Sequence, residues 1–131
     1  MKKCISVVGA VLVKDNKVLA AQRSQNMSLP GMWEFPGGKI ETSETPQQAL
    51  ARELQEELKL DARVGEEVES TTHEYDFGIV TLTTFYCALA DAEPILTEHS
   101  EIRWVEPQKL LELDWAPADI PAVEKIMKDL S

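Results

Sequence analysis

The fold of this chain is decided by two neighbouring runs, Gly37-Gly38-Lys39-Ile40-Glu41-Thr42-Ser43-Glu44 and Arg52-Glu53-Leu54-Gln55-Glu56-Glu57. In the second run, Glu53, Glu56 and Glu57 stand at i, i+3 and i+4, so a helix places their carboxylates on one side within about one turn. Anions this close together destabilise a bare helix by roughly 0.2–0.5 kcal/mol per pair. A divalent cation among them would explain the pattern, because hard cations such as Mg2+ take oxygen ligands.

The sequence also marks where this helix begins and which side it buries. Thr45 is a good N-cap, Pro46 suits the first helical position, and Gln48 completes a capping box with Thr45. An apolar stripe with helical spacing follows, formed by Leu50, Leu54 and Leu58. The carboxylates therefore flank the buried side, with Arg52 on the far side. A solvated acidic face is the simpler interpretation, but the glycine pair and the position of Glu44 argue against it.

These residues together resemble the Nudix box, the signature of the Nudix family: Gly38, five residues, Glu44, seven residues, then Arg52-Glu53-Leu54-x-Glu56-Glu57-x-x-Leu60. That family hydrolyses nucleoside diphosphates linked to another group. The one departure is Lys59, where the family usually has glycine. A glycine there ends the helix with a positive φ, and lysine adopts that conformation at a cost of roughly 1 kcal/mol. The departure concerns the helix end and none of the chemistry.

Length and charge restrict the classes of partner. The 131 residues predict one domain, residues 1–131, large enough to bury a core. Thirteen basic and 23 acidic residues give a net charge of −10, which argues against binding a nucleic-acid polymer through its phosphates. A small-molecule nucleotide is compatible with this charge, because its phosphates can arrive with Mg2+. We expect a monomer or a homodimer.

The first residues and the cysteines favour a cytoplasmic protein that does not associate with a membrane. The apolar run from Cys4 to Val13 superficially resembles a signal peptide, but its β-branched residues and the following Lys14-Asp15-Asn16-Lys17 favour a strand and a hairpin turn. Cys4 and Cys87 lie in apolar runs without metal-thiolate spacing and are expected to stay reduced. No stretch is long enough to span a membrane.

The remaining sequence predicts an α/β fold. Alternating and β-branched patterns predict strands near Ile5–Val13, Lys17–Arg23, Trp33–Phe35, Val68–Asp76, Ile79–Ala90 and Arg103–Val105. Asp76-Phe77-Gly78 is typical of a hairpin turn, Pro107–Leu113 predicts a short helix, and a last helix with an apolar core stripe follows Pro121. This order predicts a mixed β-sheet with helices on its faces, an α/β/α sandwich, and the resemblance implies the same Nudix fold.

The resemblance covers nearly the whole chain and is closest to the MutT-type nucleoside triphosphate pyrophosphohydrolases. The approach to the box, Trp33-Glu34-Phe35-Pro36-Gly37-Gly38-Lys39, is similar to theirs and implies that Glu34 lies at the substrate. Arg23 matches a position that the family uses to hold phosphate; the alternative is a surface arginine at a strand end. Lys39, beside the glycine turn, is also well placed for a phosphate, with a solvated loop lysine as the alternative.

Three positions in the second half carry further implications of the resemblance. Glu98 stands where related enzymes place a fourth carboxylate ligand, with Glu101 as the neighbour that could substitute. Asp119 falls where the family reads the base, in a segment most similar to the subgroup acting on CTP and 5-substituted deoxycytidine triphosphates. Asp119 could equally be only the N-cap of the last helix. Tyr75 is a candidate for stacking on the base, or else a core or edge aromatic.

The implied ligands lead to a mechanism. Mg2+, or Mn2+ in its place, would lower the pKa of a bound water, and the resemblance assigns its ligands as the Gly37 carbonyl with Glu53, Glu56, Glu57 and Glu98. Glu53 is assigned as the proton acceptor, with Glu98 and Glu57 as rivals. Arg52 is expected to orient a glutamate or to brace the loop through Glu44. The glycine pair lets the backbone approach metal and phosphate closely.

The predicted function is hydrolysis of a nucleoside triphosphate to a monophosphate and pyrophosphate, as the resemblance implies. CTP or modified (deoxy)cytidine triphosphates are favoured, with sanitation of the nucleotide pool as the role. Two alternatives are an 8-oxo-dGTP diphosphatase of the MutT type and a hydrolase of another nucleoside diphosphate derivative. A non-catalytic binding module is disfavoured, because every carboxylate of the box is intact.

Overall fold

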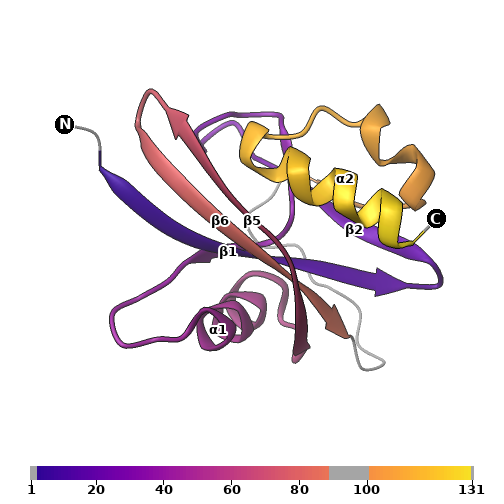
Figure 1. Cartoon of the computed structure of the whole chain (residues 1–131), viewed down its shortest axis with the longest axis horizontal. Helices are drawn as coiled ribbons and strands as arrows, with labels where there is room; N and C mark the ends of the chain where they lie inside the picture. Colours follow the sequence, from indigo (N-terminus) through magenta and orange to yellow (C-terminus); the bar gives the residue numbers. More distant parts are fainter. Residues whose placement is uncertain (1–2, 89–100, 131) are drawn as a thin grey trace.

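The computed structural model describes residues 3–88 and 101–130, which form three layers. A twisted sheet lies between helix α1 (Pro46–Leu58) on one face and helix α2 (Ile120–Asp129) on the other, as Figure 1 shows. The predicted α/β/α sandwich with a mixed sheet is therefore confirmed. The predicted ligand Glu98 falls outside the described residues.

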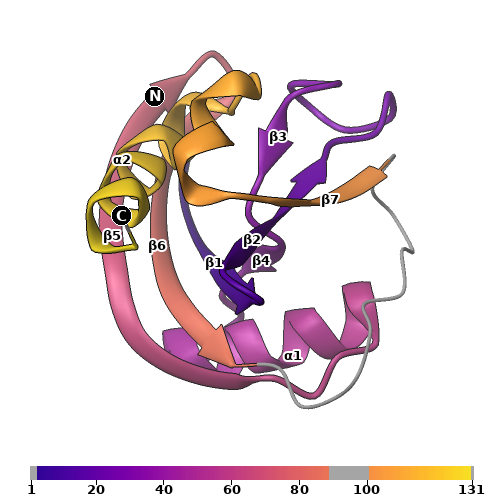
Figure 2. The same ribbon diagram turned by 90° about the vertical axis from the view of Figure 1, so that its right-hand side faces the viewer.

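Across the described residues, seven strands form the sheet, and five of them follow the order β3-β2-β1-β6-β5. The bounds are β1 (Cys4–Lys14), β2 (Lys17–Gln22), β3 (Trp33–Glu34), β4 (Gly37–Lys39), β5 (Arg63–Tyr75), β6 (Gly78–Ala88) and β7 (Glu101–Val105). The central strand β1 pairs in parallel with β6 and antiparallel with β2 and β4. Strand β7 pairs with the other edge of β2 (Figure 2). The short strand β4, which carries the glycine pair, is thereby held against the centre of the sheet.

The central strand β1 supplies residues to two separate cores. One face contributes Val8, Ala10 and Leu12 to the core around α1. The opposite face contributes Val11 to the core around α2, where it joins Ile126. Side chains alternate between the two faces of a strand, and both faces of this strand are covered. This double burial explains why the N-terminal segment is a continuous apolar run.

Helix α1 begins and ends as the sequence predicts. Thr45 Oγ1 accepts the Gln48 N–H at 3.1 Å, and Gln48 Oε1 accepts the Thr45 N–H at 2.9 Å, which is the expected capping box. At the other end, Lys59 has a φ of 56° and donates its N–H to the Leu54 carbonyl. Lysine therefore adopts the left-handed conformation for which the family usually has glycine.

Two strands differ from the prediction. The glycine pair lies in strand β4 rather than in a turn, and a Cβ on Gly37 would lie 1.9 Å from the Val8 carbonyl oxygen. Glycine at this position is therefore required by the neighbouring strand as well as by any ligand. Strand β5 begins at Arg63 rather than near Val68, and its pairing with β6 has register shifts on both sides of Glu67. These irregularities interrupt the alternation on which the prediction rests.

The C-terminal elements follow the prediction closely. The 3-10 helix η1 (Pro107–Glu112) stands where a short helix is expected, and a second one, η2 (Pro117–Asp119), leads directly into α2. Helix α2 begins one residue before Pro121 and buries Val123 and Ile126 in the core, as predicted. Within the described ranges, no helix has the length and apolar character needed to cross a membrane.

Candidate active site

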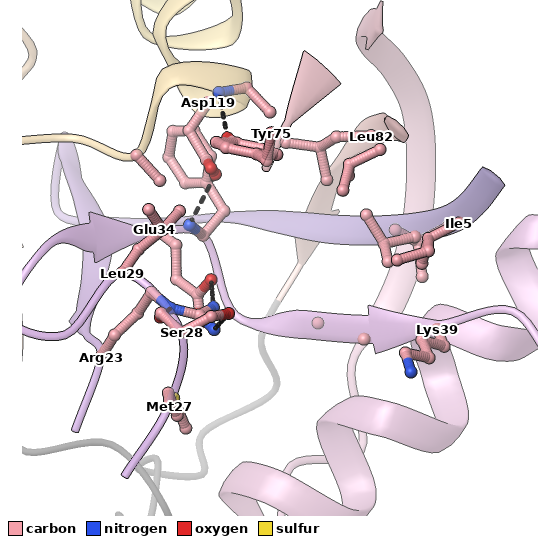
Figure 3. Close-up of a pocket in the computed structure, with 18 of the residues that line it drawn as sticks. Ile5, Arg23, Met27, Ser28, Leu29, Glu34, Lys39, Tyr75, Leu82 and Asp119 are labelled. Carbon is pink, nitrogen blue, oxygen red and sulfur yellow. Dashed lines mark hydrogen bonds and ion pairs between the residues drawn. The ribbon is translucent and has the colours of Figure 1, made fainter. Parts of the chain in front are cut away.

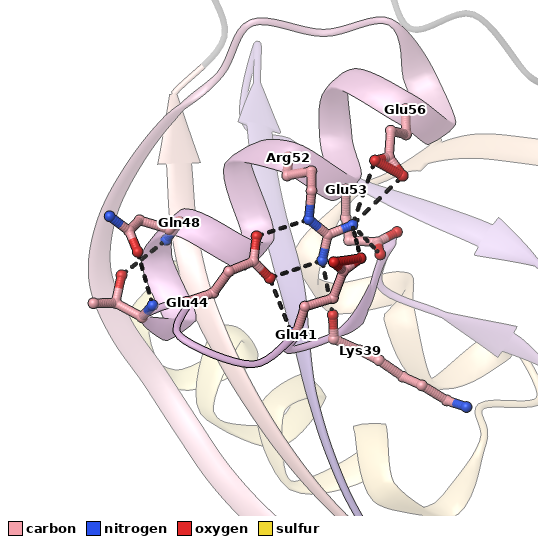
Figure 4. A network of polar contacts seen from close by, with 8 residues as sticks. Lys39, Glu41, Glu44, Gln48, Arg52, Glu53 and Glu56 are labelled. Atoms are coloured by element: carbon pink, nitrogen blue, oxygen red, sulfur yellow. Dashed lines mark hydrogen bonds and ion pairs between the residues drawn. The ribbon is translucent and has the colours of Figure 1, made fainter.

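Arg52 lies at the centre of a network that joins helix α1 to the loop before it and to strand β4 (Figure 4). Its Nε and Nη2 atoms donate to the Glu44 carboxylate at 2.8 and 2.9 Å. Its Nη1 atom donates to Glu53 Oε1 at 2.9 Å, and Nη2 also donates to the Lys39 carbonyl at 3.0 Å. Arg52 thus makes both contacts expected from the sequence, one to a glutamate of the helix and one to Glu44.

The electrostatics of this network favour charged partners on both sides. The hydrogen bonds from Arg52 lower the pKa of Glu44, and the bond that Glu44 accepts from the Glu41 N–H at 2.9 Å lowers it further. The same carboxylate raises the pKa of the Arg52 guanidinium. Because Glu44 is ionised and held at two atoms, it fixes the position from which Arg52 reaches Glu53.

The glycine pair brings backbone against two of the box carboxylates. A Cβ on Gly38 would lie 2.4 Å from the carboxyl carbon of Glu53, so a side chain here would displace this glutamate. Gly37 donates its N–H to Glu57 Oε2 at 3.2 Å. The sequence predicts glycines at a close approach to metal and phosphate, and the structure adds that Glu53 and the neighbouring strand also require them.

The third carboxylate of the box turns the other way. The Glu56 side chain is 59% exposed and lies 3.4 Å from Arg52 Nη1. Among the described residues, no group of three or more acidic, histidine or cysteine side chains is arranged to hold a metal ion. The donors present, carboxylates beside a backbone cradle at Gly38, are nevertheless of the oxygen type that hard divalent cations take. Glu53 and Glu57 are the box carboxylates placed against strand β4.

A cavity of about 300 Å3 extends from this point across the sheet. At one end it is lined by Gly37, Gly38 and Glu57, and at the other by Tyr75 and Asp119. Figure 3 shows this pocket, with Tyr75 and Asp119 together at one end and Lys39 at the other. One pocket therefore connects the glycine pair and Glu57 of the box to the residue predicted to read a base.

Asp119 is buried at the closed end of this pocket, with 5% of its surface exposed. Its Oδ1 accepts the Phe35 N–H at 3.1 Å, and its second oxygen has no hydrogen-bond partner among the described residues. Burial raises the pKa of Asp119 well above its ordinary value, and the nearby Glu34 carboxylate raises it further. Asp119 occupies the N-cap position of α2, but its side chain makes no capping bond. Asp119 therefore contributes no side-chain capping bond to α2, and its predicted role in reading the base stays a prediction.

Tyr75 stands beside Asp119 at the same end of the pocket. Its hydroxyl oxygen accepts the Ala118 N–H at 2.8 Å. Its ring stacks on Phe77, with centroids 5.0 Å apart and planes 8° from parallel, and meets His73 at 4.5 Å with a tilt of 55°. Burial raises the pKa of the Tyr75 hydroxyl. Tyr75 is thus held at its oxygen and through its ring, and its predicted stacking on a base stays a prediction.

The two basic residues predicted to bind phosphate lie at the pocket, in different surroundings. Arg23 forms an ion pair with Glu34 and donates to the carbonyl and the hydroxyl of Ser28. It therefore fastens the loop after β2 to strand β3. Lys39 lines the opposite end, with an exposed side chain directed away from Arg52 in Figure 4. Both placements are compatible with a phosphate ligand, and both roles stay predictions.

Sequence reasoning missed several residues of this site. Ser28 and Leu29 line the pocket because Arg23 draws their loop inward, and no local pattern indicates that contact. Phe77 also lines the pocket. A signal for Phe77 was present, because His73, Tyr75 and Phe77 are spaced two residues apart and side chains at i and i+2 share one face of a strand.

A carboxylate-bearing helix beside a glycine pair, inside this sandwich, defines a hydrolase of the Nudix type. The NUDIX domain family matches residues 4–126, so the chain belongs to the Nudix family. Nudix hydrolases act on small nucleotide substrates and generally use divalent metal ions.

Three relatives show where in the family the chain lies. The CTP pyrophosphohydrolase of Escherichia coli K12 is 41% identical over 125 residues, which is 95% of this chain and 93% of that protein. The 8-oxo-dGTP diphosphatase of the same organism is 31% identical over 128 residues, covering 98% and 99%. A solution structure of the DNA mismatch repair protein MutT, a Nudix hydrolase from methicillin-resistant Staphylococcus aureus 252, is 60% identical with a TM-score of 0.82, covering 98% and 99%. The predicted resemblance to MutT-type and CTP pyrophosphohydrolases is confirmed.

Proposed function

We propose that this enzyme is a Mg2+-dependent nucleoside triphosphate pyrophosphohydrolase that prefers CTP or a modified (deoxy)cytidine triphosphate and thereby clears such nucleotides from the cytoplasmic pool. One observation carries the proposal: a buried acid, Asp119, ends a pocket that begins at the glycine pair and Glu57 of the box. A nucleotide is a ligand with a base at one end and phosphates at the other. The identity to a CTP pyrophosphohydrolase supports the choice of base.

The phosphate end supplies the groups for hydrolysis. Glu53, Glu56 and Glu57, with the Gly37 carbonyl and Glu98, would hold Mg2+, which stabilises charge on phosphate oxygens and lowers the pKa of bound water. Glu53 accepts the proton of the attacking water, and Arg52 orients it through Nη1. The water oxygen bonds to the β-phosphorus, and the bond from that phosphorus to the bridging oxygen of the α-phosphate breaks. The products are a nucleoside monophosphate and pyrophosphate.

The positive groups at the pocket bind the rest of the substrate. Lys39 neutralises phosphate charge from the exposed rim. Arg23 binds phosphate through the N–H groups that are not bonded to Glu34 or Ser28. The Glu34 carboxylate raises the pKa of the buried Asp119, and two carboxyl groups at the base end favour a ligand that donates hydrogen bonds. An exocyclic amino group on the base satisfies this requirement.

Guanine is the second candidate, and one observation favours it. The second oxygen of Asp119 is an acceptor when ionised, and guanine presents two neighbouring donors, N1–H and N2–H2. The 8-oxo-dGTP diphosphatase relative supports the same alternative. Cytosine instead presents one amino donor, N4, next to the acceptor N3.

A substrate panel separates the two bases. We expect pyrophosphate release from CTP and 5-methyl-dCTP to exceed that from dGTP and 8-oxo-dGTP, measured as kcat/KM for each. Asp119→Asn, which replaces an acceptor by a donor, should change the cytosine-to-guanine ratio about tenfold. Asp129→Asn is the matched control. Asp129 lies on α2, away from the pocket, and its carboxylate accepts hydrogen bonds from Tyr86 of β6 and from Lys125.

The outcomes are distinct. Equal losses on all four substrates in Asp119→Asn would mean that the base is read elsewhere. A wild-type preference for 8-oxo-dGTP over CTP would replace the proposed substrate by the guanine alternative.

A further inference from the structure

The hydroxyl of Tyr75 can accept one hydrogen bond and donate another, and the described residues use the first of these. Its oxygen accepts the Ala118 N–H at 2.8 Å. A phenol also carries a proton that it can donate. None of the residues in the described ranges accepts that proton, although Asp119 and Glu34 are near enough to affect the pKa of the hydroxyl. Because burial raises this pKa, the group keeps its proton at neutral pH.

The ring of Tyr75 is flanked by two other aromatic rings. His73 lies two residues before Tyr75 on β5, on the same face of the strand, and Phe77 lies two residues after Tyr75, in the turn that follows. Their centroids lie 4.5 Å and 5.0 Å from that of Tyr75. Phe77 is stacked on Tyr75 with ring planes 8° apart, whereas His73 is tilted by 55° and is not stacked on it. The Phe77 ring thus occupies one face of Tyr75, and the hydroxyl is the polar group that Tyr75 brings to the pocket beside Asp119.

The position of the hydroxyl is tied to the position of Asp119. Ala118, whose N–H binds the Tyr75 oxygen, is the residue directly before Asp119 in η2. Asp119 in turn is held through Oδ1 by the Phe35 N–H, which leaves its second oxygen for a ligand. The closed end of the pocket thus contains an acceptor and a donor in fixed relation, on two elements that contact each other directly.

We propose that the Tyr75 hydroxyl donates to N3 of cytosine while Asp119 accepts from the N4 amino group. This inference rests on the proposed preference for cytidine nucleotides and explains how the pocket enforces it. Cytosine presents a donor and an acceptor side by side, which the Asp119–Tyr75 pair complements. Guanine presents two donors on the same edge, so its N1–H would face the Tyr75 proton. The Tyr75 oxygen already accepts from Ala118, which leaves it poorly placed to accept from guanine instead.

The test removes each partner of this bond in turn. Tyr75→Phe keeps the ring and its stacking but removes the hydroxyl, and 3-deaza-CTP keeps the N4 amino group but has a C–H in place of N3. We expect wild-type kcat/KM to be about tenfold lower for 3-deaza-CTP than for CTP, the scale of one hydrogen bond. In Tyr75→Phe the two substrates should be hydrolysed at nearly equal kcat/KM, because the bond is already absent.

Tyr86→Phe is the matched control. Tyr86 loses a hydroxyl bonded to Asp129 at 2.8 Å, on the neighbouring strand and outside the pocket. Its ratio of CTP to 3-deaza-CTP should equal that of the wild type. A lower melting temperature in either variant does not change the ratio of kcat/KM for CTP to that for 3-deaza-CTP, because both substrates are measured on the same protein.

Each result supports or overturns the inference. If Tyr75 only holds η2 in place, Tyr75→Phe lowers both rates and leaves the ratio at its wild-type value, which overturns the inference while the proposed function stands. Equal rates for CTP and 3-deaza-CTP in the wild type also overturn it. Failure of the wild type to hydrolyse either CTP or 5-methyl-dCTP overturns the proposed function and the inference with it.

Discussion

Glu44 and Asp119 are acidic residues at the two ends of the functional region, and their surroundings are opposite. Glu44 is bound at both oxygens by Arg52, which lowers its pKa. Asp119 is buried beside another carboxylate, Glu34, with one backbone N–H as its hydrogen-bond donor among the described residues, and its pKa is raised. The nearby Arg23 lowers the pKa of Asp119, but by less than the Glu34 carboxylate raises it.

The comparison distinguishes a carboxylate that stabilises the fold, Glu44, from one that is available to a ligand, Asp119. At the phosphate end the protein neutralises Glu44 itself, so the position of Arg52 and Glu53 does not depend on substrate. At the base end one oxygen of Asp119 has no hydrogen-bond partner among the described residues, which costs stability in the free enzyme. A base that donates a hydrogen bond there recovers part of that cost on binding.

The largest expected effect is at the phosphate end. Glu53→Gln keeps the size of the side chain and an acceptor for Arg52 but removes the proton acceptor, so we expect kcat to fall at least about 10²-fold. The free energy of unfolding without metal should change by less than about 1 kcal/mol, measured by urea denaturation. Glu66→Gln, an exposed residue of β5, is the control with normal kcat. Near-normal turnover of Glu53→Gln would remove this residue from the mechanism.

Metal binding should stabilise the same end by mass action. At about 100 times its dissociation constant, Mg2+ adds about 2.7 kcal/mol to the free energy of unfolding. We expect a higher melting temperature with Mg2+, complete loss of activity with EDTA, and a smaller shift in Glu56→Gln. Full activity in excess chelator would refute a metal-dependent mechanism, and an unchanged shift in Glu56→Gln would exclude Glu56 as a ligand.

Arg52→Lys tests whether the network positions Glu53. A lysine cannot bind both oxygens of Glu44 and also reach Glu53, because it has a single ammonium group in place of a planar fork. We expect kcat to fall about tenfold with little change in KM, since Arg52 acts on the proton acceptor rather than on the substrate. Arg63→Lys on the exposed part of β5 is the control. A large rise in KM alone would indicate that Arg52 contacts substrate directly.

The smallest effect concerns stability at the base end. Because the pKa of Asp119 is raised in the folded state above its ordinary value of 3.8, folding favours the protonated acid. The wild type therefore loses stability as pH rises from about 3.8 through the pKa of the folded state. Asp119→Asn does not titrate, so its melting temperature relative to the wild type should rise with pH over this window and then level off. A constant difference in melting temperature across pH would mean that folding does not raise the pKa of Asp119.

Much of the phosphate end follows from the sequence because it is local. The capping box of Thr45 and Gln48, the left-handed Lys59 and the pairing of Arg52 with Glu44 all join residues within one helix and the loop before it. Regular periodicity and short spacings report such contacts directly.

The base end could be predicted only in part because its contacts are distant in the chain. Asp119 was identified by resemblance, but its bond to the Phe35 N–H spans 84 positions and the bond of Tyr75 to Ala118 spans 43. No local pattern encodes a side chain that meets the backbone of a remote segment. Strand β4 was missed for a related reason, since its pairing depends on the close approach of Gly37 to Val8.

The parallel pairing of β1 with β6 has a consequence for how the protein folds during synthesis. Cys4 pairs with Ile79 and Leu12 with Cys87, so β1 meets its parallel partner only after β2, β4, α1 and β5 have been made. Until then β1 can pair with β2 and β4, but its edge toward β6 stays open. Pairing between strands that are distant in the sequence slows folding and leaves apolar segments exposed to other chains. Rapid synthesis of the middle of the chain, or a chaperone that shields the N-terminal strand, would therefore improve the yield of native enzyme.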